Sequence, residues 1–239
     1  MQFNKEKYIL LYQLNEYKDL VPILIENDVF IAGGAITSIF TNNKINDYDI
    51  YFREYKNMLN IKLFLEENKF KLLFKSDNAL SYKRDNVNIQ LIKKIYGKPE
   101  DIINQFDYTI CMGAYDFSSR KFIFNEHFLQ HNAQRQLIFN INAKYPICSL
   151  YRMLKYIKRG YIISGGEIIK LSLCVNNLKM ETFADLKEQL EGIDTMFLKD
   201  LTDRLLSYEY ANKKYDFLES ITIIDKYLNE MYLREVNGY

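Results

Sequence analysis

Residues 31–52, which form the segment IAGGAITSIFTNNKINDYDIYF, decide the fold. Its pattern predicts four elements in order: a buried strand at 29–32, a short helix at 35–40, a polar turn at 41–44 and a second strand at 48–52. Gly33 and Gly34 separate the first strand from the helix. Glycines let a backbone approach a phosphate closely, and a helix start offers unpaired N–H groups. The order therefore favours a phosphate-facing turn.

Two aspartates, Asp47 and Asp49, stand two positions apart on the second of these strands. Strand side chains alternate, so both carboxylates project from one face, roughly 7 Å apart at the backbone. Two like charges on one face favour a cation, and Mg²⁺ prefers a few carboxylates together with substrate phosphates. Two ions about 4 Å apart would activate an attacking hydroxyl and stabilise a leaving pyrophosphate. Either motif alone is common, but their order and spacing favour this site over a solvated acidic strand.

Periodicity outward from this segment predicts an α+β fold, with a mixed sheet flanked by helices and an all-helical C-terminal region. Helical spacing covers 5–26, with Pro22 as a break or the start of a new helix, and 54–68. Further strands are expected at 70–75, 79–84, 87–94, 108–116 and 121–124, with a short helix at 100–105. After about residue 144 only helices are expected, at 149–159, 168–178, 183–190, 196–208 and 221–233. Two domains follow: a head at 1–143 and a helical neck and body at 144–239.

Composition excludes several classes of protein. The 239 residues are 48% hydrophobic and carry 32 basic against 31 acidic side chains, a net charge of +1 that argues against a strongly basic nucleic-acid coat. Cys111, Cys148 and Cys174 are too few and too scattered for a disulfide framework. His127 and His131 have the spacing of a helical metal pair, although a surface pair is the favoured interpretation. No signal or membrane-spanning segment is visible, so the expected compartment is the cytoplasm.

The segment resembles the head of the DNA polymerase β-like nucleotidyltransferase superfamily, and within it the bacterial CCA-adding enzyme and poly(A) polymerase group. The stretch FDYTICMGAYD at 106–116 is similar to that group's Arg-Arg-Asp-Phe-Thr-Ile-Asn-Ala motif. The stretch PICSLYRMLKYIKRGY at 146–161 is similar to its neck helix, with a proline and spaced basic residues before a Gly-aromatic pair. Three motifs in order, covering 29–161, are far more specific than any one of them.

This resemblance implies a metal-dependent transfer of a nucleoside monophosphate from an NTP to an acceptor hydroxyl, with an RNA 3′ end as the expected acceptor. Asp47 and Asp49 match the metal-binding pair for Mg²⁺ or Mn²⁺ and the catalytic carboxylates, and Gln90 could be a third ligand through its carbonyl. The residues that the resemblance assigns to NTP binding are Gly33, Gly34, Ser38, Lys44, Asp107, Arg152 and Lys155.

The chain departs from the family pattern at several positions. Thr37-Ser38 replaces an Arg-Asp pair, and Gln105-Phe106 replaces the two arginines before Asp107. The base-selecting motif would fall at 144–148, where its charged groups are missing. The strand expected at 87–94 offers Asn88 and Gln90 but no third acid. The helical back half is too short for a full tRNA-measuring body, so CCA addition is not expected.

Two other functions stay open: a toxin-like nucleotidyltransferase that modifies a protein or a small molecule, and a degenerate fold that serves as a binding module. The oligomeric state is left open. Asp85 and Asp116 could supply the third acid, but both adjoin turns, where acids are common. Tyr151, Tyr156 and Tyr161 could stack on bases, although aromatics at helical spacing usually lie in the core. Ser164 before Gly165-Gly166 is better explained as a helix N-cap than as part of a phosphate site.

Overall fold

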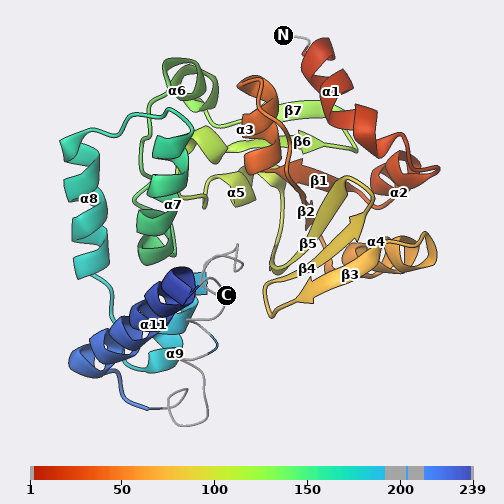
Figure 1. Cartoon of the computed structure of the whole chain (residues 1–239). Coiled ribbons are helices and arrows are strands. Elements are labelled where there is room, and N and C mark those ends of the chain that lie inside the picture. Colours follow the sequence, from red (N-terminus) through yellow and green to blue (C-terminus); the bar gives the residue numbers. More distant parts are fainter. Residues whose placement is uncertain (1–2, 192–202, 204–212, 238–239) are drawn as a thin grey trace.

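The computed structural model describes residues 3–191, 203 and 213–237, which form a mixed sheet flanked by helices and followed by a helical region (Figure 1). The strands are β1 (Val29–Ala32), β2 (Tyr48–Phe52), β3 (Lys71–Lys75), β4 (Ala79–Arg84), β5 (Val87–Tyr96), β6 (Gly113–Asp116) and β7 (Lys121–Phe124). The helices are α1 (Asn4–Leu14), α2 (Leu20–Glu26), α3 (Gly34–Phe40), α4 (Tyr55–Glu67), α5 (Pro99–Ile103), η1 (Thr109–Cys111, a 3₁₀ turn), α6 (Phe128–Gln134), α7 (Pro146–Lys158), α8 (Gly165–Asn176), α9 (Phe183–Glu191) and α11 (Phe217–Asn237).

The sheet has seven strands in the order β3-β4-β5-β2-β1-β6-β7. Strand β2 runs parallel to β5, and the other neighbours are antiparallel. The parallel register places Asp49 of β2 beside Gln90 of β5. Two positions that are 41 apart in sequence are thereby brought to one level at the centre of the sheet.

Both faces of the central strands are buried, which explains why β1 is apolar throughout. Val29 and Ile31 pack on one face against apolar side chains of α1, α2, α3 and α4. Phe30 and Ala32 belong to the opposite face, with apolar side chains of α5, α7 and α8. Helices α5, α7 and α8 therefore cover the face that also carries Asp49 and Tyr51, because strand side chains alternate.

The expected fold class is confirmed, with local differences. The strand expected at 108–116 starts only at Gly113, because Cys111 and Met112 donate backbone hydrogen bonds three residues back and close the 3₁₀ turn η1. Helix α7 begins at Pro146 rather than at 149, since proline suits the first turn of a helix. Helix α6 lies where no helix was expected. The helix expected at 196–208 lies almost wholly outside the described residues.

Most of the isolated residues with two interpretations have structural roles, and Tyr151 is the exception. Asp116 is buried and pairs with Arg53 at 3.1 Å, and Asp85 sits in a turn with a positive φ of 51°. Tyr156 and Tyr161 are buried in the core, whereas Tyr151 is exposed. The Ser164 side chain accepts a hydrogen bond from the Glu167 N–H, as an N-cap does.

Histidine 131 should make folding stability sensitive to mild acid. Burial, aided by the charge of the stacked His127 and opposed by Glu167, lowers the pKa of His131, whose Nδ1 lies 2.8 Å from the Thr109 hydroxyl. The unfolded chain binds this proton more readily, so stability is kept above about pH 6.5 and lost as the pH falls below it. We expect the melting temperature to fall less between pH 7.5 and pH 5.5 in His131→Asn than in the unchanged chain. Equal falls for His131→Asn and the unchanged chain would contradict the assignment.

Candidate active site

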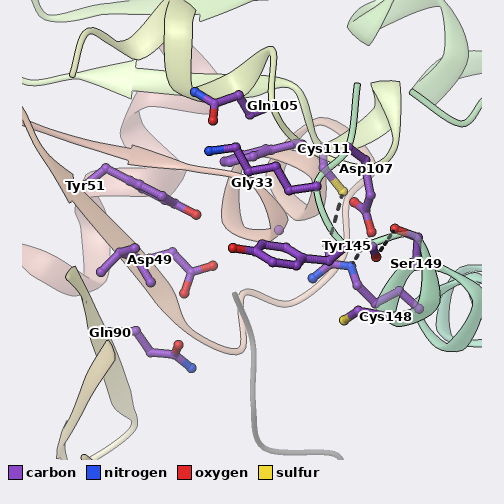
Figure 2. A pocket seen from close by; sticks show the side chains of 16 residues that line it. Gly33, Asp49, Tyr51, Gln90, Gln105, Asp107, Cys111, Tyr145, Cys148 and Ser149 are labelled. Carbon is purple, nitrogen blue, oxygen red and sulfur yellow. Dashed lines mark hydrogen bonds and ion pairs between the residues drawn. The ribbon is translucent and has the colours of Figure 1, made fainter. Parts of the chain in front are cut away.

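A pocket opens between the centre of the sheet and the start of α7 (Figure 2). Its cavity volume is about 70 Å³. The lining comes from the turn after β1, from β2 and β5, from η1 and the stretch before it, and from the residues around the start of α7. The lining residues are Gly33, Gly34, Asp49, Tyr51, Gln90, Ile92, Gln105, Phe106, Asp107, Cys111, Ala143, Lys144, Tyr145, Cys148, Ser149 and Arg152. The expected turn, the acidic strand and the neck helix therefore meet at one place.

The glycine turn forms one wall of the pocket. Gly33 has a φ of +81°, which L side chains rarely adopt, and its N–H donates to the Gly113 carbonyl at 3.0 Å. A Cβ added to Gly33 would lie 3.5 Å from the Phe106 ring and 4.0 Å from Oδ2 of Asp49. The backbone of the turn thus borders the Asp49 carboxylate directly, which leaves no side chain between this carboxylate and the end of β1.

A second wall combines carboxylate and amide groups. Asp49 and Gln90 are neighbours in the parallel pair of β2 and β5, and Nε2 of Gln90 donates to Oδ2 of Asp47 at 3.3 Å. Asp47 precedes β2 and is half-buried, as is Asp49. The structure therefore groups the two aspartates with the amide of Gln90.

These three side chains suit a hard cation. In residues 3–191, 203 and 213–237, no group of three His, Cys, Asp or Glu side chains is placed to hold a metal ion. Two carboxylates and one amide nevertheless form an all-oxygen donor set, which Mg²⁺ accepts together with water and phosphate. The amide oxygen and nitrogen of Gln90 exchange places by a simple flip, so the carbonyl can turn toward a cation beside Asp47. The donor chemistry fits the expected Mg²⁺ or Mn²⁺.

Placing an acid at position 90 should make folding depend on the metal. In Gln90→Glu a third carboxylate joins Asp47 and Asp49, and we expect about 1–2 kcal/mol of destabilisation in a chelator because like charges then crowd together. Added Mg²⁺ or Mn²⁺ should raise the melting temperature of this variant more than that of the unchanged chain. Thermal melts measure both effects. Gln105→Glu, which adds an acid elsewhere on the same pocket, is the matched control, and equal metal responses of the two variants would contradict the site.

The opposite end of the pocket holds an ion pair. Nε of Arg152 lies 2.7 Å from Oδ2 of Asp107, and the side chains are only 24% and 11% exposed. Arg152 also donates to the Tyr156 hydroxyl at 3.0 Å, and that hydroxyl lies 2.8 Å from Sγ of Cys111. Burial opposes the charge of Arg152, but the interactions with Asp107, Tyr156 and the two cysteines Cys111 and Cys148 together outweigh it and raise the pKa of the guanidinium above its ordinary range. Arg152 is therefore a fixed cation at the pocket wall.

The thiol in this cluster is uncharged at neutral pH. Cys111 is buried, and this burial raises the pKa of its thiol even though Arg152 works in the opposite direction. The thiolate form that a nucleophile requires is thus disfavoured. Cys111 is better understood as a packed, neutral wall of the pocket than as a nucleophile.

The structure brings together only part of the expected site. The pocket is lined by Gly33, Gly34, Asp49, Gln90, Asp107 and Arg152, and Asp47 is tied to it through Gln90. The lining does not include Ser38, Lys44 or Lys155: Ser38 is buried within α3, Lys44 is exposed in the turn before β2, and Lys155 is half-buried on α7. Their roles in NTP binding stay predictions.

Several lining residues were not expected. Tyr51 follows Asp49 by two positions and shares its face of β2, so strand alternation could have identified it. Tyr145, Cys148 and Ser149 enter the pocket because α7 starts at Pro146 and points its first turn at the sheet. The sequence carries no signal that would place these three residues in the pocket, since their position depends on how α7 packs against the sheet.

Solved structures with a similar fold are CCA-adding enzymes. A complex of a CCA-adding enzyme with ATP aligns with a TM-score of 0.57 at 16% identity, covering 91% of this chain and 52% of that chain. The Thermotoga maritima CCA-adding enzyme complexed with tRNA aligns with a TM-score of 0.55 at 15% identity, covering 94% and 58%. At this identity the likeness confirms the nucleotidyltransferase-like fold expected from the motifs.

Sequence relatives identify the family. A protein of Bacillus phage SPbetaL7 named "Gabija anti-defense 2" is 37% identical over 240 residues, which span 98% of this chain and 58% of the relative. The family described as "Gad2: Gabija anti-defense 2 family protein" matches residues 3–135, which include the glycine turn, the acidic strand and Asp107. None of the helices that the structure describes is long and apolar enough to cross a membrane. The chain belongs to the Gabija anti-defense 2 family.

Proposed function

We propose that this chain is a metal-dependent nucleotidyltransferase that transfers a nucleoside monophosphate from an NTP to an acceptor hydroxyl, and that it acts against a defence system in this way. The observation that carries the proposal is that Asp49 and Gln90 line one pocket beside the Gly33 turn, while Asp47 accepts a hydrogen bond from Gln90. The name of the phage relative supports the anti-defense role, and the CCA-adding enzyme fold supports the reaction.

The residues have distinct roles in this reaction. Asp47, Asp49 and the Gln90 carbonyl would hold Mg²⁺ or Mn²⁺, which, when bound, neutralises the triphosphate and activates the acceptor hydroxyl. The Gly33 turn leaves room for phosphate beside Asp49. Arg152, held by Asp107, supplies a fixed positive charge at the other end of the pocket. The acceptor oxygen bonds to the α-phosphorus, pyrophosphate leaves, and the hydroxyl proton passes to solvent.

We favour an RNA 3′ end as the acceptor, because the neighbours in fold include an enzyme complexed with tRNA. The anti-defense name of the relative favours a second candidate, a protein of the defence that it counteracts. The replacement of the third acid by Gln90 favours a third, a binding module that retains the fold without transfer. These candidates differ in what becomes labelled.

Incubation with α-labelled NTPs separates the three. The purified chain is mixed with each NTP in turn, Mg²⁺ or Mn²⁺, and an extract of cells that carry the Gabija defence. Label in RNA that disappears when the 3′ ends are first oxidised with periodate supports transfer to RNA, and label in protein supports the second candidate. If nothing is labelled, a thermal shift decides: a competent site gains about 2.7 kcal/mol at a hundred times the dissociation constant of its NTP. A thermal shift without label would indicate a binding module. The absence of both a shift and label would overturn the proposal.

A further inference from the structure

The ring of Tyr145 lies across the pocket. Tyr145 is half-buried at the N-cap of α7, and Figure 2 shows its ring in the middle of the lining, with its hydroxyl end toward the side of Asp49 and Tyr51. Asp107, Cys148 and Ser149 are drawn on the other side of the ring. The aromatic side chain thus stands between the carboxylate end and the Asp107–Arg152 end of the same pocket.

Two charged residues hold this ring from outside the lining. Nζ of Lys94, on β5, lies 4.7 Å from the centroid of the Tyr145 ring and 2.8 Å from Oε1 of Glu188, on α9. The Tyr145 hydroxyl lies 3.4 Å from the same Glu188 oxygen. We call these two residues the Lys94–Glu188 clamp. It joins the sheet, the start of the neck helix and the helical region at one ring.

Lys94 is the cation of the clamp. Burial opposes the charge of Lys94, but hydrogen bonds to Glu188 and to Tyr145 outweigh it and raise the pKa of the ammonium. The side chains of Lys94 and Glu188 are 27% and 53% exposed, so they can be changed without opening the core. A contact of this kind is weak enough to break when a ligand competes with it.

The pocket is too small for a nucleotide while the ring stays in place. Its cavity volume of about 70 Å³ compares with roughly 300–1,000 Å³ for pockets that hold small ligands. Tyr51 and Phe106 in the lining are buried in the core and cannot yield. Tyr145 is half-buried and precedes its helix, so it is the large aromatic side chain in the lining that can turn outward at little cost.

We propose that Lys94 and Glu188 are positioning residues that hold Tyr145 across the pocket, so that a nucleotide binds only after this ring turns outward. The inference rests on the proposed function, because it names the nucleotide as the ligand that displaces the ring. A site that is competent only part of the time binds with an apparent affinity lowered by that fraction. Releasing the clamp therefore strengthens nucleotide binding.

Two cysteines inside the pocket report the position of the ring without any nucleotide. Cys111 and Cys148 line the pocket and are buried, and Cys174 → Ser removes the more exposed thiol from the background. In that background, Glu188→Gln and Lys94→Met should each raise the rate at which a small maleimide labels Cys148 by about three- to tenfold, the range for losing one partly exposed ion pair and one cation–π contact. Peptide mass spectrometry assigns the label to Cys148 or Cys111.

Glu191→Gln is the matched control, because it removes an ion pair to Lys187 at 3.1 Å on the same helix α9 without touching Tyr145. Its labelling rate should equal that of the Cys174→Ser parent. If Glu188→Gln and Lys94→Met also label at the parental rate while melting at the parental temperature, the clamp does not hold the ring and the inference is overturned. Tyr145→Ala provides a second test, since it removes the ring itself and should label at least as fast as Glu188→Gln.

Equilibrium dialysis with an α,β-methylene NTP and Mg²⁺ tests whether releasing the clamp strengthens nucleotide binding. Glu188→Gln should lower the dissociation constant by about the same three- to tenfold factor as the labelling rate, and Glu191→Gln should leave it unchanged. Faster labelling without tighter binding, in a chain that binds the nucleotide, overturns the inference for nucleotide entry. If no variant binds any NTP although labelling responds to the clamp, the proposed function fails, and nucleotide entry fails with it.

Discussion

Replacing Asp47 and Asp49 together by asparagine is expected to lower the transfer of label by at least about a thousandfold. The cation that these carboxylates would hold contributes several kcal/mol of transition-state stabilisation, and each 1.36 kcal/mol corresponds to a factor of ten in rate. Both side chains are half-buried, so folding should change by no more than about 1 kcal/mol. Initial rates with α-labelled NTP and extract, beside a thermal melt, measure the two effects separately.

The matched control removes two other acids from the same sheet. Asp77 and Asp85 lie in the connections on either side of β4, away from the pocket lining, and Asp77→Asn with Asp85→Asn should keep the transfer rate within about twofold. Asparagine tolerates the positive φ of 51° at position 85. Transfer that survives loss of Asp47 and Asp49 would contradict the metal site, and transfer lost equally in both double variants would point to a general defect.

Local sequence patterns were sufficient to predict the strands of the sheet and which of them are antiparallel neighbours. The uninterrupted apolar run of β1 predicts a strand buried on both faces, and turn residues at 77–78 and 85–86 predict the antiparallel order of β3, β4 and β5. These features depend on residues close together in sequence. The turn η1 was missed because Thr109–Cys111 carries the β-branched and apolar residues of a strand, while its backbone closes a turn before Gly113.

The site was predictable where strand alternation and motif order define it. The spacing of a strand places Asp47 and Asp49 near each other, and the register places Gln90 beside Asp49, while the role of Gln90 as a third ligand stays a prediction. Tyr145 and Glu188 could not be foreseen in the same way. Their meeting depends on how α9 packs against the start of α7, and neither residue belongs to a recognisable pattern.

Arg152 is expected to matter for folding as well as for the pocket, because it joins α7 to the stretch before η1 through Asp107. Truncating it in Arg152→Met leaves the Asp107 carboxylate, 11% exposed, without its cation. Breaking a fully buried pair costs about 3–5 kcal/mol, and the partial exposure here reduces the expected loss to about 2–3 kcal/mol. This corresponds to a melting temperature lower by roughly 4–12 °C for a chain of this size.

Removing both charges should restore most of that stability. In Asp107→Asn with Arg152→Met no uncompensated charge remains, and replacing a buried ion pair by neutral groups is often close to neutral, so we expect a net loss below about 1 kcal/mol. Urea denaturation of the two single variants and the double variant gives the coupling energy between the residues. Lys213→Met, which removes an exposed pair with Glu219, controls for loss of a surface charge and should cost less than about 1 kcal/mol. A double variant as unstable as Arg152→Met would show that Arg152 stabilises the chain by packing, through Tyr156 and Cys111, rather than by its charge.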